Sequence, residues 1–190
     1  MTKAIILTLD TQGGIGSRQR LMHQELRSKG WKVDVASYAT YPDFPELSVP
    51  SWRLFHSSPS CKISQIDDTL YYHVGCYLPE FEWKHYTPSR IWNQILAQYD
   101  LVIGVSASVL PALPAVVNCV PCFIWAGTPY SPDRKDRITH FSPARRLFDY
   151  CVDQPVCRYL EKYILTRAFV TVTSAYCEES FEKLVPGSVQ

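Results

Sequence analysis

The sequence of 190 residues lacks several features that would assign it to a specialised class of protein. No apolar run reaches the ~20 residues that a membrane-spanning helix needs. Lys and Arg (19) almost balance Asp and Glu (18), so the net charge of +1 creates no overall field that would attract nucleic acid or a membrane. Internal repeats and low-complexity segments are missing too. The hydrophobic content of 46% is that of one globular domain with an ordinary core.

Signatures of disulfides, metals and secretion are also missing. The seven cysteines are odd in number and scattered, which argues against a disulfide framework and favours a reducing cytoplasm. Cys119 and Cys122 have C-x-x-C spacing but lead into a predicted strand, and no second ligand pair accompanies them. We therefore expect them to pack rather than to bind metal. The five histidines show no metal-ligand spacing, and residues 3–9 indicate a buried strand rather than a signal peptide.

Predicted strands and helices alternate along the chain. The predicted strands are 3–9, 31–37, 61–66, 69–74, 100–105, 121–126 and 168–173. The predicted helices are 17–29, one opening at Thr87 and Pro88, 108–117, 142–167 with a kink or break at Pro155, and 174–184. This alternation favours a single Rossmann-like α/β domain, with a doubly wound, mainly parallel sheet and helices on both faces.

Two aromatic-rich excursions interrupt the alternation. Segment 38–60 contains four prolines, and segment 75–86 follows the predicted strand 69–74. Ligands of doubly wound sheets bind beyond the carboxyl ends of the strands, so one hypothesis is that both segments flank that cleft. The alternative is that they fold back over the sheet as a satellite core.

A glycine-rich corner over residues 10–16 follows the first predicted strand. It fails the dinucleotide fingerprint, because the third position counted from Gly14 is Gln19, and no acidic residue ends the second strand. The P-loop pattern is absent as well. The corner either simply turns the chain or presents the N–H groups of a helix N-terminus to an anion. Arg18 directly after it favours phosphate.

Two further motifs leave alternatives open. Gly104–Ser108 is similar to a nucleophile elbow but ends in serine instead of glycine, so a serine hydrolase is a minor possibility. Segment 133–146 carries five basic residues against two acidic ones. It is either an ordinary solvated face or a patch that binds an anionic ligand or a membrane surface.

Two motifs near the ends of the chain resemble one family. Gly13–Arg18 followed by His23–Val35 is similar to the glycine corner and "L-x-x-x-G-(H/W)-x-V-x-V" segment of the GT-B type glycosyltransferases, which have two Rossmann domains. Residues 159–168 with 170–174 resemble the segment that closes their N-terminal domain. The order and spacing of the motifs place the resemblance over essentially the whole chain, within the retaining glycogen-synthase and sucrose-synthase-like group.

The resemblance implies a metal-independent transfer of sugar from a nucleotide-sugar donor, without a cofactor. It implies that Gly14, Gly16 and Arg18 reach the donor diphosphate and that this domain binds the acceptor, a sugar or a lipid-linked molecule. We assign the acceptor contacts to residues that follow the predicted strand 121–126, namely Thr128, Tyr130, Arg134 and His140. No nucleic-acid partner is expected.

The sequence departs from the family in two respects. Ala126-Gly127-Thr128 replaces the loop segment that often carries a histidine near the transferred sugar, so no catalytic residue is assigned. The sequence ends where the second domain would begin, so we expect 1–190 to be an acceptor-side domain that is inactive without a C-terminal donor-binding domain.

The expected location is cytoplasmic, with peripheral membrane contact through residues 134–146. The alternatives are a non-enzymatic Rossmann-like binding or partner module, and part of a sugar-nucleotide epimerase.

Overall fold

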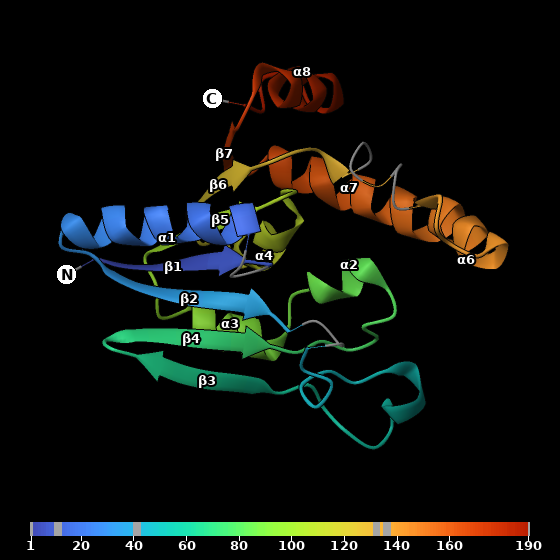
Figure 1. The fold of residues 1–190 in the computed structure, drawn as a ribbon, viewed down its shortest axis with the longest axis horizontal. Coiled ribbons are helices and arrows are strands. Elements are labelled where there is room, and N and C mark those ends of the chain that lie inside the picture. Colours follow the sequence, from blue (N-terminus) through green and yellow to red (C-terminus); the bar gives the residue numbers. More distant parts are fainter. Residues whose placement is uncertain (1, 10–12, 40–42, 131–133, 135–137, 190) are drawn as a thin grey trace.

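One mixed sheet forms the centre of the molecule (Figure 1). The computed structural model describes residues 2–9, 13–39, 43–130, 134 and 138–189. The strands are β1 (Lys3–Thr8), β2 (Lys32–Tyr38), β3 (Cys61–Ile66), β4 (Thr69–Val74), β5 (Leu101–Ser106), β6 (Cys122–Ala126) and β7 (Phe169–Val172). Their order across the sheet is β3-β4-β2-β1-β5-β6-β7, and only β3 and β4 are antiparallel neighbours.

The six parallel strands have the winding order of a doubly wound fold. When β3 is set aside, the remaining strands follow the order 3-2-1-4-5-6 in chain sequence. The chain therefore winds in one direction from β1 to β4, and then returns to β1 and continues on its other side with β5. The predicted Rossmann-like α/β fold is confirmed, and the switch point between β1 and β5 is the usual ligand position.

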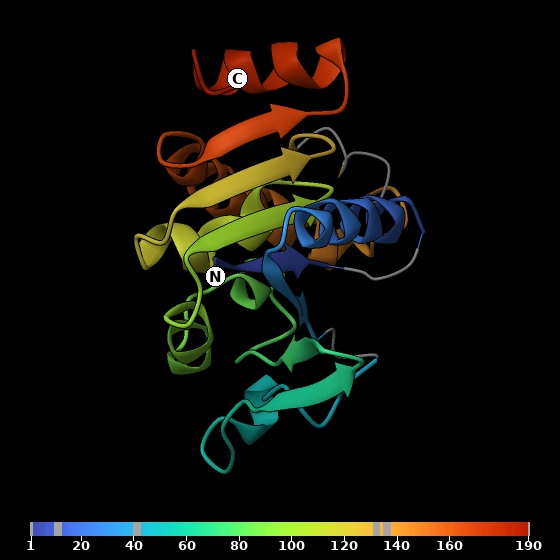
Figure 2. The ribbon, with the colours of Figure 1, turned by 90° about the vertical axis from the view of Figure 1, so that its left-hand side faces the viewer.

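Helices cover both faces of the sheet, as predicted. The α-helices are α1 (Gly13–Ser28), α2 (Glu82–His85), α3 (Arg90–Leu96), α4 (Leu113–Val117), α6 (Pro143–Phe148), α7 (Gln154–Leu165) and α8 (Ala175–Leu184). Short 3-10 turns occupy Ser51–Arg53 and Leu110–Ala112, and a π-helical segment occupies Asp149–Asp153. Figure 2 shows α1 on one side of the sheet and α3 on the other. Within the described ranges, no helix has the length and apolar character to cross a bilayer.

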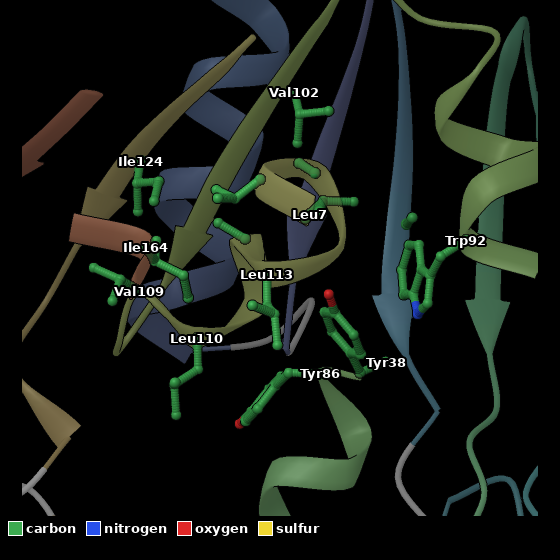
Figure 3. Packing of buried hydrophobic residues seen from close by; sticks show 14 of the residues in the cluster. Leu7, Tyr38, Tyr86, Trp92, Val102, Val109, Leu110, Leu113, Ile124 and Ile164 are labelled. Atoms are coloured by element: carbon green, nitrogen blue, oxygen red, sulfur yellow. The ribbon is translucent and has the colours of Figure 1, made fainter. Parts of the chain in front are cut away.

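The core is divided by the sheet into two clusters of unequal size. Ile6, Val33, Ile103 and Val105 face α1, where Met22 and other apolar side chains of the helix region pack on them. The larger cluster lies on the opposite face (Figure 3), and it includes Leu7, Tyr38, Trp92, Leu113, Ile124 and Ile164. Residues 4–7 of β1 are fully buried, which explains why this strand is apolar at successive positions rather than at alternate ones.

The two aromatic-rich excursions lie at the carboxyl ends of the strands and bind each other. Since β2 and β4 are parallel, the segments that follow them emerge at the same edge of the sheet. Val49 N donates to Cys76 O (2.9 Å), and Leu78 N donates to Val49 O (2.8 Å). Their aromatic residues differ in burial: Tyr86 is buried in the core, as the satellite-core alternative predicts, whereas Phe55 is 94% exposed.

Two helix starts differ from the prediction. Helix α1 begins at Gly13 rather than Ser17, so the glycines form its first turn, and Gly13 adopts φ of +58°. Helix α3 is capped by Ser89 instead of Thr87: the Ser89 hydroxyl accepts a hydrogen bond from Trp92 N at 3.3 Å. Pro88 disfavours helical geometry at the preceding residue, which delays the start.

The predicted break near Pro155 is confirmed in a specific form. The π-helical segment separates α6 from α7 and ends just before Pro155, which lies in the first turn of α7. Proline has no backbone N–H, so it is tolerated only where the helical ladder needs no donor from it. The predicted caps Ser142 and Ser174 both accept bonds from backbone N–H groups of their helices.

We expect Gly75→Ala to destabilise the fold strongly. A Cβ atom at Gly75 would lie 1.9 Å from the carbonyl oxygen of Leu47, where backbone pairing leaves no room to move. The free energy of unfolding, measured by chemical denaturation, should fall by about 3 kcal/mol. In the matched control Gly14→Ala, nothing lies within 4 Å of the new atom. An equal loss in both variants would contradict this account of the excursion.

Candidate functional site

The carboxyl ends of β1, β5 and β6 bring three segments together at one edge of the sheet, here called the carboxyl edge. These segments are the start of α1, residues 106–108 and residues 127–130. Gly127 N donates to the carbonyls of Ser106 and Ala107, both at 3.0 Å, and Thr128 N donates to Ala107 O at 2.6 Å. The loops after β5 and β6 are therefore joined by backbone hydrogen bonds.

Gly127 occupies a position with little space for a side chain. A Cβ atom there would lie 3.2 Å from Ala107 O and 3.4 Å from Nη2 of Arg18. The Gly127 carbonyl accepts a hydrogen bond from Cys177 Sγ at 2.7 Å and from Thr173 Oγ1 at 3.2 Å. The absence of a side chain at Gly127 lets α1, the loop after β5 and the start of α8 approach one another.

Arg18 holds its guanidinium group against this edge. Its guanidinium carbon lies 5.7 Å from the centre of the Trp125 ring, and Nη1 is buried without a hydrogen-bond partner in the described part of the chain. Desolvation lowers the pKa of Arg18 from its usual value, which indicates that the protein around it offers little compensation for the charge. A buried donor of this kind is satisfied by a ligand with acceptor oxygens.

The other two predicted phosphate-binding residues lie beside Arg18 in α1. Gly14 is exposed, and nothing lies within 4 Å of the position that a Cβ would occupy. Gly16 is buried. The first turn of a helix has backbone N–H groups without helical partners, so this arrangement can bind an anion. Of the three residues, Arg18 is the one that the structure places next to the loop after β6.

The predicted acceptor residues Thr128 and Tyr130 are held firmly in the loop after β6. Tyr130 is buried, and its backbone N–H donates to Oε1 of Glu161 at 2.9 Å. Glu161 is only 1% exposed, and burial raises its pKa to about 7 although the Tyr130 N–H and Arg158 oppose the shift. Sequence reasoning missed Glu161, because the carboxylate faces the loop from α7, 31 residues further along the chain.

Arg134 belongs to a buried ionic cluster instead of an open surface. Its Nε donates to Oδ1 of Asp149 at 2.6 Å, and Nη2 lies 3.5 Å from Oδ2 of Asp153. Arg134 also pairs with Glu82 of α2, and Arg145 donates to Oδ2 of Asp153 at 2.8 Å. The ionic contacts of Arg134 with the described residues are therefore internal, and we do not carry its acceptor role into the proposal below.

The remaining basic residues of segment 134–146 differ in their surroundings. Arg146 donates to the carbonyls of Thr139 (2.6 Å) and Phe141 (2.9 Å). His140, the fourth predicted acceptor residue, is exposed. Lys135 and Arg137 lie outside the described residues. Membrane or acceptor contact by this segment stays a prediction.

The lesser motifs have ordinary structural roles. The Ser106 hydroxyl is fully buried and donates to the Ser108 carbonyl, which differs from the exposed serine of a nucleophile elbow. Cys122 packs against the core as predicted, whereas Cys119 is exposed with φ of +55°. Among the described residues, no group of three metal-ligating side chains occurs.

Two hollows lie away from the carboxyl edge. A hollow of about 420 Å³ at the amino end of the sheet is lined by Arg27 and Asp68, but these two residues pair with each other at 2.7 Å. A groove of about 300 Å³ lies between α1 and β4, lined by Gln19, Arg20, Tyr71 and His73 among others. Neither contains the Arg18 guanidinium, so we keep the carboxyl edge as the candidate site.

Comparison with known proteins gives no matching family model and no matching curated sequence. The functional argument therefore rests on the residues of the carboxyl edge and on the two sequence motifs described above.

The buried carboxyl of Glu161 predicts a pH-dependent stability. Because its pKa is about 7 in the folded chain, against an ordinary 4.5, the folded state holds a proton that the unfolded state releases. This contribution is complete below pH 4.5 and is lost as pH rises to 7. Relative to Glu161→Gln, the wild type should lose about 3 kcal/mol of unfolding free energy across that window.

The measurement is urea denaturation from pH 4.5 to pH 8. Glu161→Gln keeps an oxygen acceptor for Tyr130 N–H, so its native structure should persist. The exposed control Glu46→Gln should follow the wild type. If the unfolding free energies of wild type and Glu161→Gln change with pH in parallel, the Glu161 carboxyl ionises in the folded chain without loss of stability, and the prediction is refuted.

Proposed function

We propose that this chain is the acceptor-side domain of a glycosyltransferase that uses a nucleotide-sugar donor. The observation that carries the proposal is the Arg18 guanidinium, whose Nη1 has no hydrogen-bond partner among the described residues and whose Nη2 lies against Gly127 after β6. A planar guanidinium matches the oxygens of a diphosphate, and a site with one unsatisfied buried N–H favours a ligand that supplies such oxygens.

The position of Arg18 in the fold supports the same ligand class. Ligands of doubly wound sheets bind beyond the carboxyl ends of the strands, and α1 begins beside the switch point between β1 and β5. Gly14 leaves open space at the first turn of α1, so a phosphate group could approach the backbone there. The two sequence motifs that resemble GT-B type transferases narrow the anion to the diphosphate of a sugar nucleotide.

The roles of the residues follow from the chemistry of sugar transfer. Negative charge develops on the leaving diphosphate when the bond to the sugar breaks, and preorganised donors at that position lower the barrier. Arg18 and the first N–H groups of α1 would supply part of this stabilisation. Thr128 would orient the acceptor from the loop after β6, whereas the ring of Tyr130 is buried in the core and would only hold that loop in place. This edge forms one wall of a cleft, so we propose that a donor-binding domain completes the site.

Isothermal titration with inorganic pyrophosphate and with a uridine diphosphate sugar tests the proposal. Binding should be weak, in the millimolar range, because only one wall of the site is present. The loss of a hydrogen bond to a charged group in Arg18→Ala should weaken binding about tenfold or more. Arg18→Lys should retain part of the affinity, since a lysine keeps the charge but not the planar geometry.

Arg20→Ala is the matched control, because it removes the same charge from the other side of α1, beside the groove toward β4. It should bind both probes like the wild type. Near-micromolar binding of the nucleotide sugar would overturn the assignment to the acceptor side. Equal binding by wild type and Arg18→Ala would overturn the diphosphate site itself.

A further inference from the structure

Helix α6, the π segment and α7 form one long rod that presents a continuous exposed stripe. In Figure 1 this rod begins beside α4 and extends beyond the carboxyl ends of the strands. The exposed positions recur every three or four residues, and the π segment keeps them in line. The stripe is made of Arg146, Leu147, Tyr150, Cys151, Pro155, Arg158, Tyr159 and Lys162.

Large apolar side chains of the stripe remain exposed although the inner face of the rod packs well. Cys157 and Ile164 of α7 are fully buried in the larger core cluster. On the outer face, Leu147 is 66% exposed, Tyr150 is 73% exposed and Tyr159 is 69% exposed. Three such side chains along one line are more than the scattered apolar residues of an ordinary surface, and they indicate an interaction face.

The ionic side chains of the rod are sorted by sign. Residues 142–167 contain three acidic residues, Asp149, Asp153 and Glu161, and the structure buries all of them. The cations Arg146, Arg158 and Lys162 are exposed. The carboxylates are therefore withdrawn into the ionic cluster and toward Tyr130, and the stripe carries positive charge only.

We propose that this stripe docks the protein on the surface of an anionic lipid bilayer. A helix that lies in the bilayer interface has cations that meet phosphate headgroups and apolar or aromatic side chains that enter the boundary of the acyl chains. The stripe offers both kinds of side chain along one line about 25 Å long, at 1.5 Å per residue. Its cations complement the charge of the headgroups, and each contributes substantially near an anionic surface.

The exposed apolar side chains favour a bilayer over a soluble polyanion. A nucleic-acid duplex would meet Arg146, Arg158 and Lys162 with its phosphates and would leave Leu147 and Tyr150 without an apolar partner. A bilayer can bind both the cations and the apolar side chains of the stripe. Tyrosine is suited to the bilayer interface because its ring is apolar and its hydroxyl is polar. Docking would bring the carboxyl edge close to the lipid surface, and the inference is independent of the transferase proposal.

Vesicle co-sedimentation tests the inference with the chain as it stands. Vesicles of phosphatidylcholine alone are compared with vesicles that also contain phosphatidylglycerol. The neutralising variant Arg158→Gln/Lys162→Gln should lower the partition coefficient on anionic vesicles by about tenfold or more. The matched control Lys32→Gln/Arg90→Gln removes two exposed cations from β2 and α3 and should bind like the wild type.

A second variant separates insertion from simple charge attraction. Leu147→Ser/Tyr150→Ser keeps every charge and alters only exposed side chains, so its circular dichroism should match that of the wild type. The inference predicts that it also loses most of its binding to anionic vesicles. Unchanged binding of this variant, equal binding of wild type to neutral vesicles, or an equal loss in the Lys32/Arg90 control would overturn the inference. Tighter binding to heparin than to vesicles would assign the stripe to a polyanion instead.

Discussion

The burial of Asp149 and Asp153 against Arg134 and Arg145 is the constraint on which the carboxyl edge depends. Removing one partner of a buried ion pair leaves an uncompensated charge, which commonly costs about 3–5 kcal/mol. The cluster also includes Glu82 of α2, so it fixes the rod of α6 and α7 relative to the segment after β4. Burial raises the pKa of Asp153, while both arginines oppose that shift and favour its charged form. The rod and α2 are therefore joined beside the edge by ionic contacts between distant segments.

This constraint divides the arginines of the edge into two groups. Arg134 and Arg145 have carboxylate partners inside the protein, so their charge is already compensated. Arg18 stacks on Trp125, and its buried Nη1 has no partner among the described residues. Burial also removes Asp149, Asp153 and Glu161 from the surface of the rod, whereas Arg146, Arg158 and Lys162 remain exposed and form the cationic stripe.

Local sequence signals were sufficient for much of the fold. The apolar runs, Gly30 with φ of +80° and the serine caps predicted the strands and most helix ends, because these features depend on neighbouring residues. The predicted start of α1 was wrong, because glycines that are typical of a turn can also form the first turn of a helix. The partners of Arg134 could not be predicted, because Glu82 comes from a distant segment and Asp149 and Asp153 have spacing equally typical of an exposed helix face. Trp125 and Glu161 had no sequence signal beyond the periodicity of their elements.

The central claim is that Arg134 and Arg145 are bound to carboxylates inside the protein, whereas Arg18 can bind an anionic ligand. It is tested most directly by observing the arginine Nε–Hε resonances by NMR during a titration with inorganic pyrophosphate. We expect the Arg18 resonance to shift in a saturable way, while the resonances of Arg134 and Arg145 keep their positions because their donors are bound to carboxylates. A shift of Arg134 with no change at Arg18 would contradict the account.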